Sequence, residues 1–530
     1  MTDVIIVGGG PVGLLLACEL KLGGVDPLVL EAATGDQRRT RSLGLRSLNA
    51  RTVQSLALRG LAEPVAEAQW AMLDELRGRR SPSAEGDVVA LMVEVLEKGM
   101  VRGHFSGLPL LEAGGGAEYL MLGQDSLEAI LAERATAMGV RILPGSEVTD
   151  VVQEESCVVA TLADGRTVRG SYLAGCDGGR SVVRKRTGFA FEGTPPTMTG
   201  RTAVAELADP GALSSSLRSP GGLVNLSLVP GEIATIEFGG GPDERDAPMT
   251  AAELEASLRR VTGLDVVVNR LETGIRYSDN TRHAETYVKG RVLLAGDAAH
   301  VHSPIGGQGL NLGLQDAISL GWRLALVARG LAPRALLDGY TAERHPVAAR
   351  VLRNTKAQVA LMRPGPQVDA LREVLSEVLE LPDAKRYFSE MVDGTGIGYA
   401  PGSPDPHVGR FAPPMEVRVP GAEGTRALTA SLGDGRGLLV DLSGGEGTDG
   451  LEAAVAGHRD RVGTARAAVP GGTGLLLVRP DGYVAWTSGH ATSSGHAAPS
   501  GHAAPGGDDR PGGRDGLGGA LTAWFGPPLR

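Results

Sequence analysis

The amino-acid sequence predicts an α/β protein with three parts: a doubly wound dinucleotide-binding domain, an antiparallel sheet inserted into it, and a small C-terminal α/β unit. Three observations lead to this prediction. The chain opens with a buried strand, a glycine-rich turn and a helix. Stretches of alternating polarity occur between residues 188 and 271. A glycine- and proline-rich stretch, residues 393–420, then precedes two further apolar strands.

The first thirty-one residues carry the dinucleotide-binding pattern. Residues 4–7 are wholly apolar, as expected for a strand buried on both faces of a parallel sheet. The G-x-G-x-x-G spacing that follows allows a tight turn, leaves room for a pyrophosphate and lets the next helix, residues 11–22, pack closely. A second strand ends at Glu31, whose carboxylate can accept hydrogen bonds from ribose hydroxyls. The cofactor-facing residues predicted here are Gly8, Gly10, Pro11, Val12, Gly13 and Glu31.

Composition excludes several classes of function. The 530 residues suffice for two or three domains. With 52 basic and 62 acidic residues and no long basic run, a nucleic-acid or anionic-membrane surface is not predicted. The three cysteines form no C-x-x-C pair, which argues against a metal cluster or a dithiol. No signal peptide and no membrane-spanning run is visible, so we expect a cytoplasmic protein.

The pattern of the first domain continues after the opening motif. Residues 32–42 are polar, and their arginines could neutralise a cofactor phosphate. Helices are predicted over residues 47–61 and 124–138, and an antiparallel meander between residues 148 and 169. An apolar strand then ends in Asp177-Gly178, at the sheet edge where open α/β sheets bind ligands.

A second apolar strand that ends beside an aspartate leads into Gly296-Asp297, where the carboxylate can accept hydrogen bonds from sugar-alcohol hydroxyls. The glycine-rich loop at residues 303–311 and the predicted helix at 312–329 offer clustered backbone N–H donors to an electron-rich ring. His300 and His302 lack a further ligand set, so they are predicted to be ordinary loop or core histidines, and no metal site is expected.

The remaining chain is predicted to be helical over residues 336–364 and 369–391, with the C-terminal strands at 438–442 and 474–478. Between residues 487 and 519 a Ser-Gly-His-Ala near-repeat occurs three times. Its composition cannot bury a core, so we interpret it as a disordered insertion rather than a metal-binding tract.

Taken together, the motif at residues 8–13 with Glu31, the segment 176–184 and the segment 296–311 resemble the class A flavoprotein monooxygenases, the family of p-hydroxybenzoate hydroxylase. Arg344 and the segment 478–486 resemble the branch with a C-terminal thioredoxin-like domain, which includes aromatic polyketide hydroxylases, rifampicin-type monooxygenases and phenol hydroxylases. The domains implied are a Rossmann-like FAD-binding domain (1–185 and, with a helical region, 273–392), an inserted antiparallel substrate-binding layer (186–272) and a thioredoxin-like α/β domain (393–530, with the insertion at 487–516).

The resemblance also implies roles for matching positions. Glu31 would hold the adenosine ribose, Asp297 the ribityl chain, and Pro304 would lie beside the flavin ring. The other positions implied to contact FAD are Arg41, Gln124, Asp177, Gly307, Gly309, Leu310 and Asn311. The chain departs from the family at Ser319, where asparagine is common, and in lacking a C-x-x-C pair. The C-terminal domain is therefore expected to be structural or oligomeric, as in a homodimer.

The implied function is an FAD-dependent monooxygenase that consumes NADPH or NADH and O2. Reduced flavin forms a C4a-hydroperoxide, which must be shielded from water and which hydroxylates a phenolic, polycyclic polyketide in natural-product tailoring. Pro304, Arg46 and Tyr277, with His283, are the candidates for residues that face the reacting centre. Baeyer–Villiger insertion, hydroxylation that inactivates an antibiotic, and a flavin-binding protein without turnover are the alternatives. The exact substrate, the phenol-deprotonating base and the choice between NADPH and NADH stay open.

Overall fold

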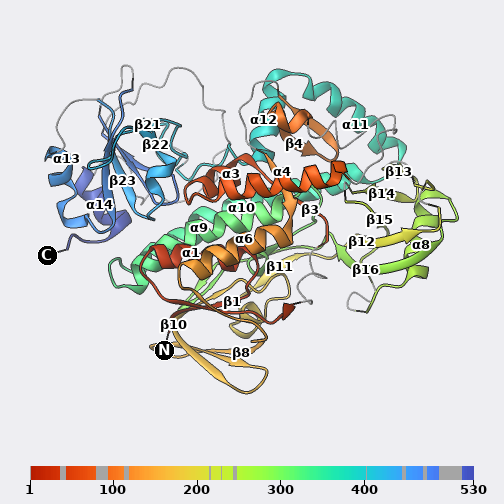
Figure 1. The fold of residues 1–530 in the computed structure, drawn as a ribbon, viewed down its shortest axis with the longest axis horizontal. Helices are drawn as coiled ribbons and strands as arrows, with labels where there is room; N and C mark the ends of the chain where they lie inside the picture. Colours follow the sequence, from red (N-terminus) through yellow and green to blue (C-terminus); the bar gives the residue numbers. More distant parts are fainter. Residues whose placement is uncertain are drawn as a thin grey trace.

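The computed structural model describes residues 2–35, 43–78, 94–112, 119–209, 211–213, 216–227, 229–242, 247–400, 403–443, 449–469, 474–488 and 516–529. The predictions for Arg41 and its neighbouring arginines, and for the Ser-Gly-His-Ala repeats apart from Ser488, fall outside these ranges. The C-terminal unit, drawn in blue, lies at one end of the molecule, and the inserted sheet with α8 lies at the other (Figure 1). The predicted α/β class is confirmed.

The central sheet has eight strands, and its parallel core places the functional loops at one edge. The strand order is β18-β19-β10-β1-β2-β7, and β8 and β9 extend the sheet from β10. The bounds are β1 (Thr2–Val7), β2 (Pro27–Leu30), β7 (Arg141–Leu143), β8 (Val148–Gln153), β9 (Val158–Leu162), β10 (Thr167–Gly175), β18 (Val288–Lys289) and β19 (Val292–Leu294). Because β1, β10 and β19 are parallel neighbours, Gly8, Asp177 and Asp297 all follow the same ends of adjacent strands.

Three helices pack beside this sheet: α1 (Pro11–Leu22), α6 (Gln124–Ala137) and α9 (Gln308–Ala328), with α1 in contact with both others. Almost every residue of α9 is buried, as expected for a helix inside the core. The longest helix, α10 (Ala335–Met362), packs along α9. Its Val359 side chain, near the C-terminal end, contacts an apolar cluster with residues of the inserted sheet.

The inserted sheet is antiparallel, with the order β13-β14-β15-β12-β16. Its elements are β12 (Met198–Leu207), β13 (Leu217–Ser219), β14 (Gly222–Leu226), β15 (Glu232–Phe238), β16 (Val268–Ser278) and the helix α8 (Ala251–Thr262). Side chains of β15 alternate between two environments. Thr235 bonds Ser257 of α8 at 2.8 Å, whereas Ile236 and Phe238 pack with Ile305 of the glycine-rich loop. One face of the sheet therefore meets α8 and the other meets the loop.

Smaller elements connect these parts. A three-stranded sheet joins β11 (Phe191–Thr194), β17 (Thr281–Ala284) and β20 (His300–Val301). Two-stranded sheets join β3 (Leu45–Leu48) with β6 (Leu120–Gly123), β4 (Val101–Phe105) with β5 (Leu108–Leu111), and β21 (Glu416–Val417) with β22 (Arg426–Ala427). The other helices of these parts are α3 (Ala50–Ala57), α4 (Ala62–Gly78), α7 (Val182–Arg186), α11 (Pro366–Leu379) and α12 (Pro382–Asp393).

The C-terminal unit is a mixed sheet of order β24-β23-β25-β26, in which β23 and β24 are parallel. Its bounds are β23 (Gly437–Asp441), β24 (Val462–Arg466), β25 (Leu475–Val478), β26 (Val484–Thr487), α13 (Asp449–Ala454) and α14 (Leu517–Phe525). The described part of the chain contains no helix long and apolar enough to cross a membrane.

Three predicted elements were wrong in detail. The helix predicted over residues 47–61 begins only at Ala50, because residues 45–48 form β3 and Asn49 caps the helix. The helix predicted over 369–391 is two helices, since Pro382 starts a new one. The helix predicted from residue 312 begins at Gln308, directly after the left-handed Gly307.

Candidate active site

Glycine is needed in the opening turn for two different physical reasons. A Cβ on Gly8 (φ 105°) would lie 2.3 Å from the Cys176 carbonyl oxygen, and one on Gly13 would lie 2.0 Å from the Gly8 oxygen. These two glycines are required by the packing of the protein itself. A Cβ on Gly10 would meet no described protein atom within 4 Å. The backbone at Gly10, at the start of α1, is thus open to a ligand, which fits the predicted pyrophosphate.

Glu31 lies at the end of β2, buried beside this turn. One carboxylate oxygen accepts a hydrogen bond from the Gly9 amide at 2.7 Å, and the other accepts from the Ala33 amide at 2.7 Å. Each carboxylate oxygen has a second acceptor position. The side chain is therefore held in place by the backbone and still fits a pair of ribose hydroxyls.

Asp177 and Asp297 follow β10 and β19 at the same sheet edge. The Val183 amide donates to one oxygen of Asp177 at 3.1 Å, while its other oxygen is buried and has no hydrogen-bond partner among the described residues. Burial raises the pKa of Asp177, and hydrogen bonds from Ser181 and the backbone oppose this rise. Asp297, in the short 3₁₀ turn η1 (Gly296–Ala298), is exposed and available to a ligand.

The glycine-rich loop leads directly into α9. Gly306 (φ 89°) and Gly307 (φ 62°) turn the chain, and Pro304 is exposed. Gly309, Leu310 and Asn311 lie in the first turn of α9, where backbone N–H groups lack helical partners. The Asn311 side chain accepts from the Asn49 amide at 2.9 Å and donates to the Ser47 carbonyl at 2.8 Å. This side chain thereby ties the loop to β3.

Arg46 of β3 lies where the inserted sheet meets the edge of the central sheet that carries Asp297. Its Nε donates to the side-chain oxygen of Gln124 at 3.0 Å. Burial lowers the pKa of Arg46, and the charges of Glu232 and Asp297 oppose this shift, so both carboxylates lie close enough to act on the guanidinium. Tyr277 of β16 belongs to the same surroundings, and burial raises its pKa to about 12.

The structure brings four of the predicted residues together and places His283 elsewhere. Arg46, Gln124, Asp297 and Tyr277 meet at the junction between the loop and the inserted sheet. His283 instead bonds the Tyr287 hydroxyl at 2.6 Å and stacks on His345 with ring centroids 3.9 Å apart.

The inserted layer was expected to bind the substrate, but the individual residues of two features of this junction were not predicted. Glu232, buried on β15, faces Arg46, and burial raises its pKa. An apolar wall lies beside them, formed by Met198, Ile236, Phe238, Ile305, Val359 and Met362. The period-two alternation of β15 was a usable signal, since it places Glu232, Ile236 and Phe238 on one face.

A separate cavity of about 470 Å³ lies between α3, α4 and the strands β4 and β6. Tyr119 lines both this cavity and a small one beside Gly307 and Asn311. The larger cavity also touches Val53, Ala62, Glu63, Ala66, Gln69, Trp70, Leu96, Gly99, Val101 and Leu120. Within the described ranges, no group of three or more His, Cys, Asp or Glu side chains could hold a metal ion.

Comparison with known proteins agrees with this geometry. Residues 1–355 match the FAD binding domain family, and residues 405–528 match the family described as aromatic-ring hydroxylase, C-terminal. The chain is 38% identical to rifampicin monooxygenase of Streptomyces venezuelae (92% of this chain, 95% of the relative). It is 34% identical to dialkyldecalin synthase of Streptomyces rugosporus (92% and 96%).

Among solved structures, OxyS anhydrotetracycline hydroxylase from Streptomyces rimosus superimposes with a TM-score of 0.80 at 34% identity, over 100% of both chains. The matched families cover both ends of the chain, and the relatives extend over nearly its whole length. The chain thus belongs to the FAD-dependent aromatic-ring monooxygenases, the family that its three sequence motifs resemble.

Proposed function

We propose that this protein adds one oxygen atom from O2 to a phenolic, polycyclic, polyketide-type substrate, using FAD and NADPH or NADH. The observation that carries the proposal is the junction where Arg46 and Tyr277 lie beside an apolar wall and within reach of the glycine-rich loop. An aromatic polycycle needs such an apolar wall, and its phenol needs a few polar groups to orient it. The names of relatives that act on tetracyclines and rifampicin support this substrate class.

The FAD-binding roles follow the sheet edge. The Gly10 backbone and the start of α1 would bind the pyrophosphate, Glu31 the ribose, and Asp297 with Gln124 the ribityl region. Asp177 would support the cofactor on the same edge, and Arg41 would bind its phosphate–ribose region. The amides of Gly307, Gly309, Leu310 and Asn311 would face the pyrimidine edge of the flavin. Bound FAD supplies the activation of O2, which no amino-acid side chain can provide.

The chain's own residues would orient the substrate and exclude water. Arg46 keeps its positive charge at neutral pH, so it would stabilise negative charge that develops on a phenol oxygen. The Tyr277 hydroxyl, whose raised pKa keeps it protonated, would donate a hydrogen bond there. Pro304 and Ile305 would close the site against water from the loop side.

The first experiment is NADPH and NADH oxidation by the purified holoenzyme, with and without a panel of phenolic polycyclic polyketides, with the product mass recorded. A substrate-stimulated rate and a gain of one oxygen atom are expected. NMR of the product then separates hydroxylation from lactone formation by Baeyer–Villiger insertion. A product isomeric with its substrate, formed without NAD(P)H, would instead indicate ring closure of the kind that the name dialkyldecalin synthase denotes.

A cytoplasmic location and a homodimer are included in the proposal. A cytoplasmic enzyme has direct access to NAD(P)H. Light scattering coupled to size-exclusion chromatography tests the homodimer, and a monomer over the working concentration range would contradict it.

Gly200→Ala is expected to disturb the substrate site without weakening FAD binding. A Cβ on Gly200 would lie 2.1 Å from the Tyr277 ring, so the ring must move. We expect the substrate-stimulated rate of NADPH oxidation to fall about tenfold, which corresponds to about 1.4 kcal/mol of transition-state stabilisation. The Kd for FAD, measured by flavin fluorescence, should stay at the wild-type value. A normal rate would show that Tyr277 does not shape the reacting centre.

A further inference from the structure

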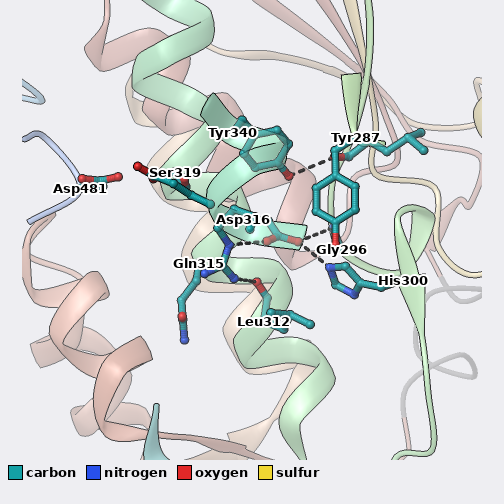
Figure 2. Close-up of polar contacts among 12 residues, drawn as sticks. Tyr287, Gly296, His300, Leu312, Gln315, Asp316, Ser319, Tyr340 and Asp481 are labelled. Atoms are coloured by element: carbon teal, nitrogen blue, oxygen red, sulfur yellow. Dashed lines mark hydrogen bonds and ion pairs between the residues drawn. The ribbon is translucent and has the colours of Figure 1, made fainter. Parts of the chain in front are cut away.

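A fully buried carboxylate, Asp316, lies behind the FAD-binding edge on the third turn of α9. Figure 2 shows its side chain pointing from the helix towards His300 and Gly296. One oxygen of Asp316 accepts from His300 Nε2 at 2.7 Å and from the Gly296 amide at 3.2 Å. These two donors bracket Asp297, so a single carboxylate oxygen holds both ends of the turn that carries it.

Arg344 of α10, also fully buried, holds the other oxygen of Asp316. Its Nε donates to Asp316 at 2.7 Å, and one Nη donates to the Leu312 carbonyl in the first part of α9 at 3.1 Å. The other Nη donates to the Tyr399 hydroxyl at 2.9 Å. Arg344 thus fixes Asp316 and the beginning of α9 together.

Burial alone would raise the pKa of Asp316. The charges of Arg344 and His300 and the hydrogen bonds they donate outweigh this effect and hold that pKa below its ordinary value. The carboxylate is therefore charged at neutral pH and accepts from three donors that belong to three separate elements.

Close packing at Gly313 brings α9 near enough for Asp316 to accept from the Gly296 amide and His300. A Cβ on Gly313 would lie 2.7 Å from the Val12 side chain and 3.2 Å from the Gly296 Cα. The start of α1, the Asp297 turn and α9 therefore meet at one point. These three elements carry the backbone and side chains that would bind the pyrophosphate, the ribityl chain and the flavin ring.

We propose that Asp316, held by Arg344, is a positioning residue for FAD: it fixes the turn containing Asp297 relative to the first turn of α9. It touches no cofactor atom itself. Without it, the Gly296 amide and His300 lose a buried acceptor, and the turn must rearrange to satisfy them. The proposal concerns FAD binding in the absence of substrate, so it stands or falls independently of the proposed substrate.

A neighbouring network provides the matched control. Glu343, beside Arg344 on α10, is also buried, but it accepts from Arg323 and from Arg479 of the C-terminal unit. It makes no contact with the Asp297 turn among the hydrogen bonds of the described residues. Glu343→Gln should therefore lower stability without altering the cofactor site.

The experiment compares Asp316→Asn and Glu343→Gln after removal and re-addition of FAD. We expect Asp316→Asn to raise the Kd for FAD at least about tenfold and to change the visible absorption and circular dichroism of the bound flavin. The asparagine amide cannot accept from all three donors. We expect Glu343→Gln to keep the wild-type Kd and spectrum although its melting temperature falls. Wild-type FAD binding by Asp316→Asn, or equal weakening in both variants, would overturn the proposal.

His300→Gln and His300→Leu form a second pair that leaves Asp316 in place and so keeps the proposal testable should Asp316→Asn not fold. Glutamine can donate to the Asp316 carboxylate, whereas leucine of similar size cannot. The glutamine variant is expected to bind FAD several-fold more tightly than the leucine variant. Equal affinities of the two variants would contradict the positioning role.

Discussion

Gly10→Ala is expected to leave the apoprotein folded and to weaken FAD binding by about tenfold or more, equivalent to about 1.4 kcal/mol. Gly10 has φ −74° and ψ −177°, which alanine adopts without strain, and its Cβ would touch no described protein atom within 4 Å. The methyl group would instead occupy the space through which a pyrophosphate reaches the start of α1. The melting temperature of the apoprotein and the Kd for FAD separate the two effects.

Gly13→Ala is the informative comparison for this variant. A Cβ at position 13 would lie 2.0 Å from the Gly8 carbonyl oxygen, so α1 and β1 must move apart whether or not a cofactor is bound. We expect a lower melting temperature for the apoprotein of Gly13→Ala and an unchanged one for Gly10→Ala. If Gly10→Ala binds FAD like the wild type, the pyrophosphate does not approach the backbone at Gly10.

Glu343→Gln is expected to cost about 3–5 kcal/mol of stability, the usual range for breaking a buried ion pair. Glu343 accepts from Arg323 at 2.6 Å and from Arg479 at 2.7 Å, and both arginines are almost completely buried. Glutamine keeps the shape but removes the charge between two cations. In the variant, Asp481 still pairs with Arg479 at 2.7 Å. The Arg323 guanidinium lies 3.7 Å from Asp481, so Arg323 is left with a weaker partner than Arg479. The melting temperature of the holoenzyme should fall by several degrees.

Asp383→Asn serves as the control for this change. Asp383 also pairs with an arginine, Arg386, at 2.7 Å, but both side chains are more than half exposed. Water replaces that interaction, so no measurable change in melting temperature is expected. An equal, small shift for both variants would mean that the buried network around Glu343 contributes little to stability.

Much of the site could be predicted because it is encoded locally. The order of strand, glycine turn, helix and acid lies within the first thirty-one residues, and each part has its own physical signature there. Gly309 to Asn311 were expected to present their amides, and the structure places them in the first helical turn. The start of that helix was set four residues too late, because the glycine-rich sequence before Leu312 does not resemble a helix.

The rest depends on pairs far apart in the chain. Asn49 and Asn311 are 262 residues apart, and no periodicity in either segment indicates that they meet. Glu232 and Arg46 come together only because the inserted sheet turns one face towards β3. Asp316 was not singled out within the predicted helix, because its burial and its ion pair with Arg344 depend on how α9 and α10 pack.

Formation of the ion-pair network around Glu343 depends on the order in which the chain is synthesised. Arg479 follows Glu343 by 136 residues, and protein domains assemble from the N-terminus as the ribosome extends them. While the nascent chain ends before Arg479, Glu343 can pair only with Arg323, and the hydrogen bonds that Arg479 donates to Glu343 cannot yet form. The buried network that joins α9, α10 and the C-terminal unit is therefore completed only after the segment that carries Arg479 has left the ribosome.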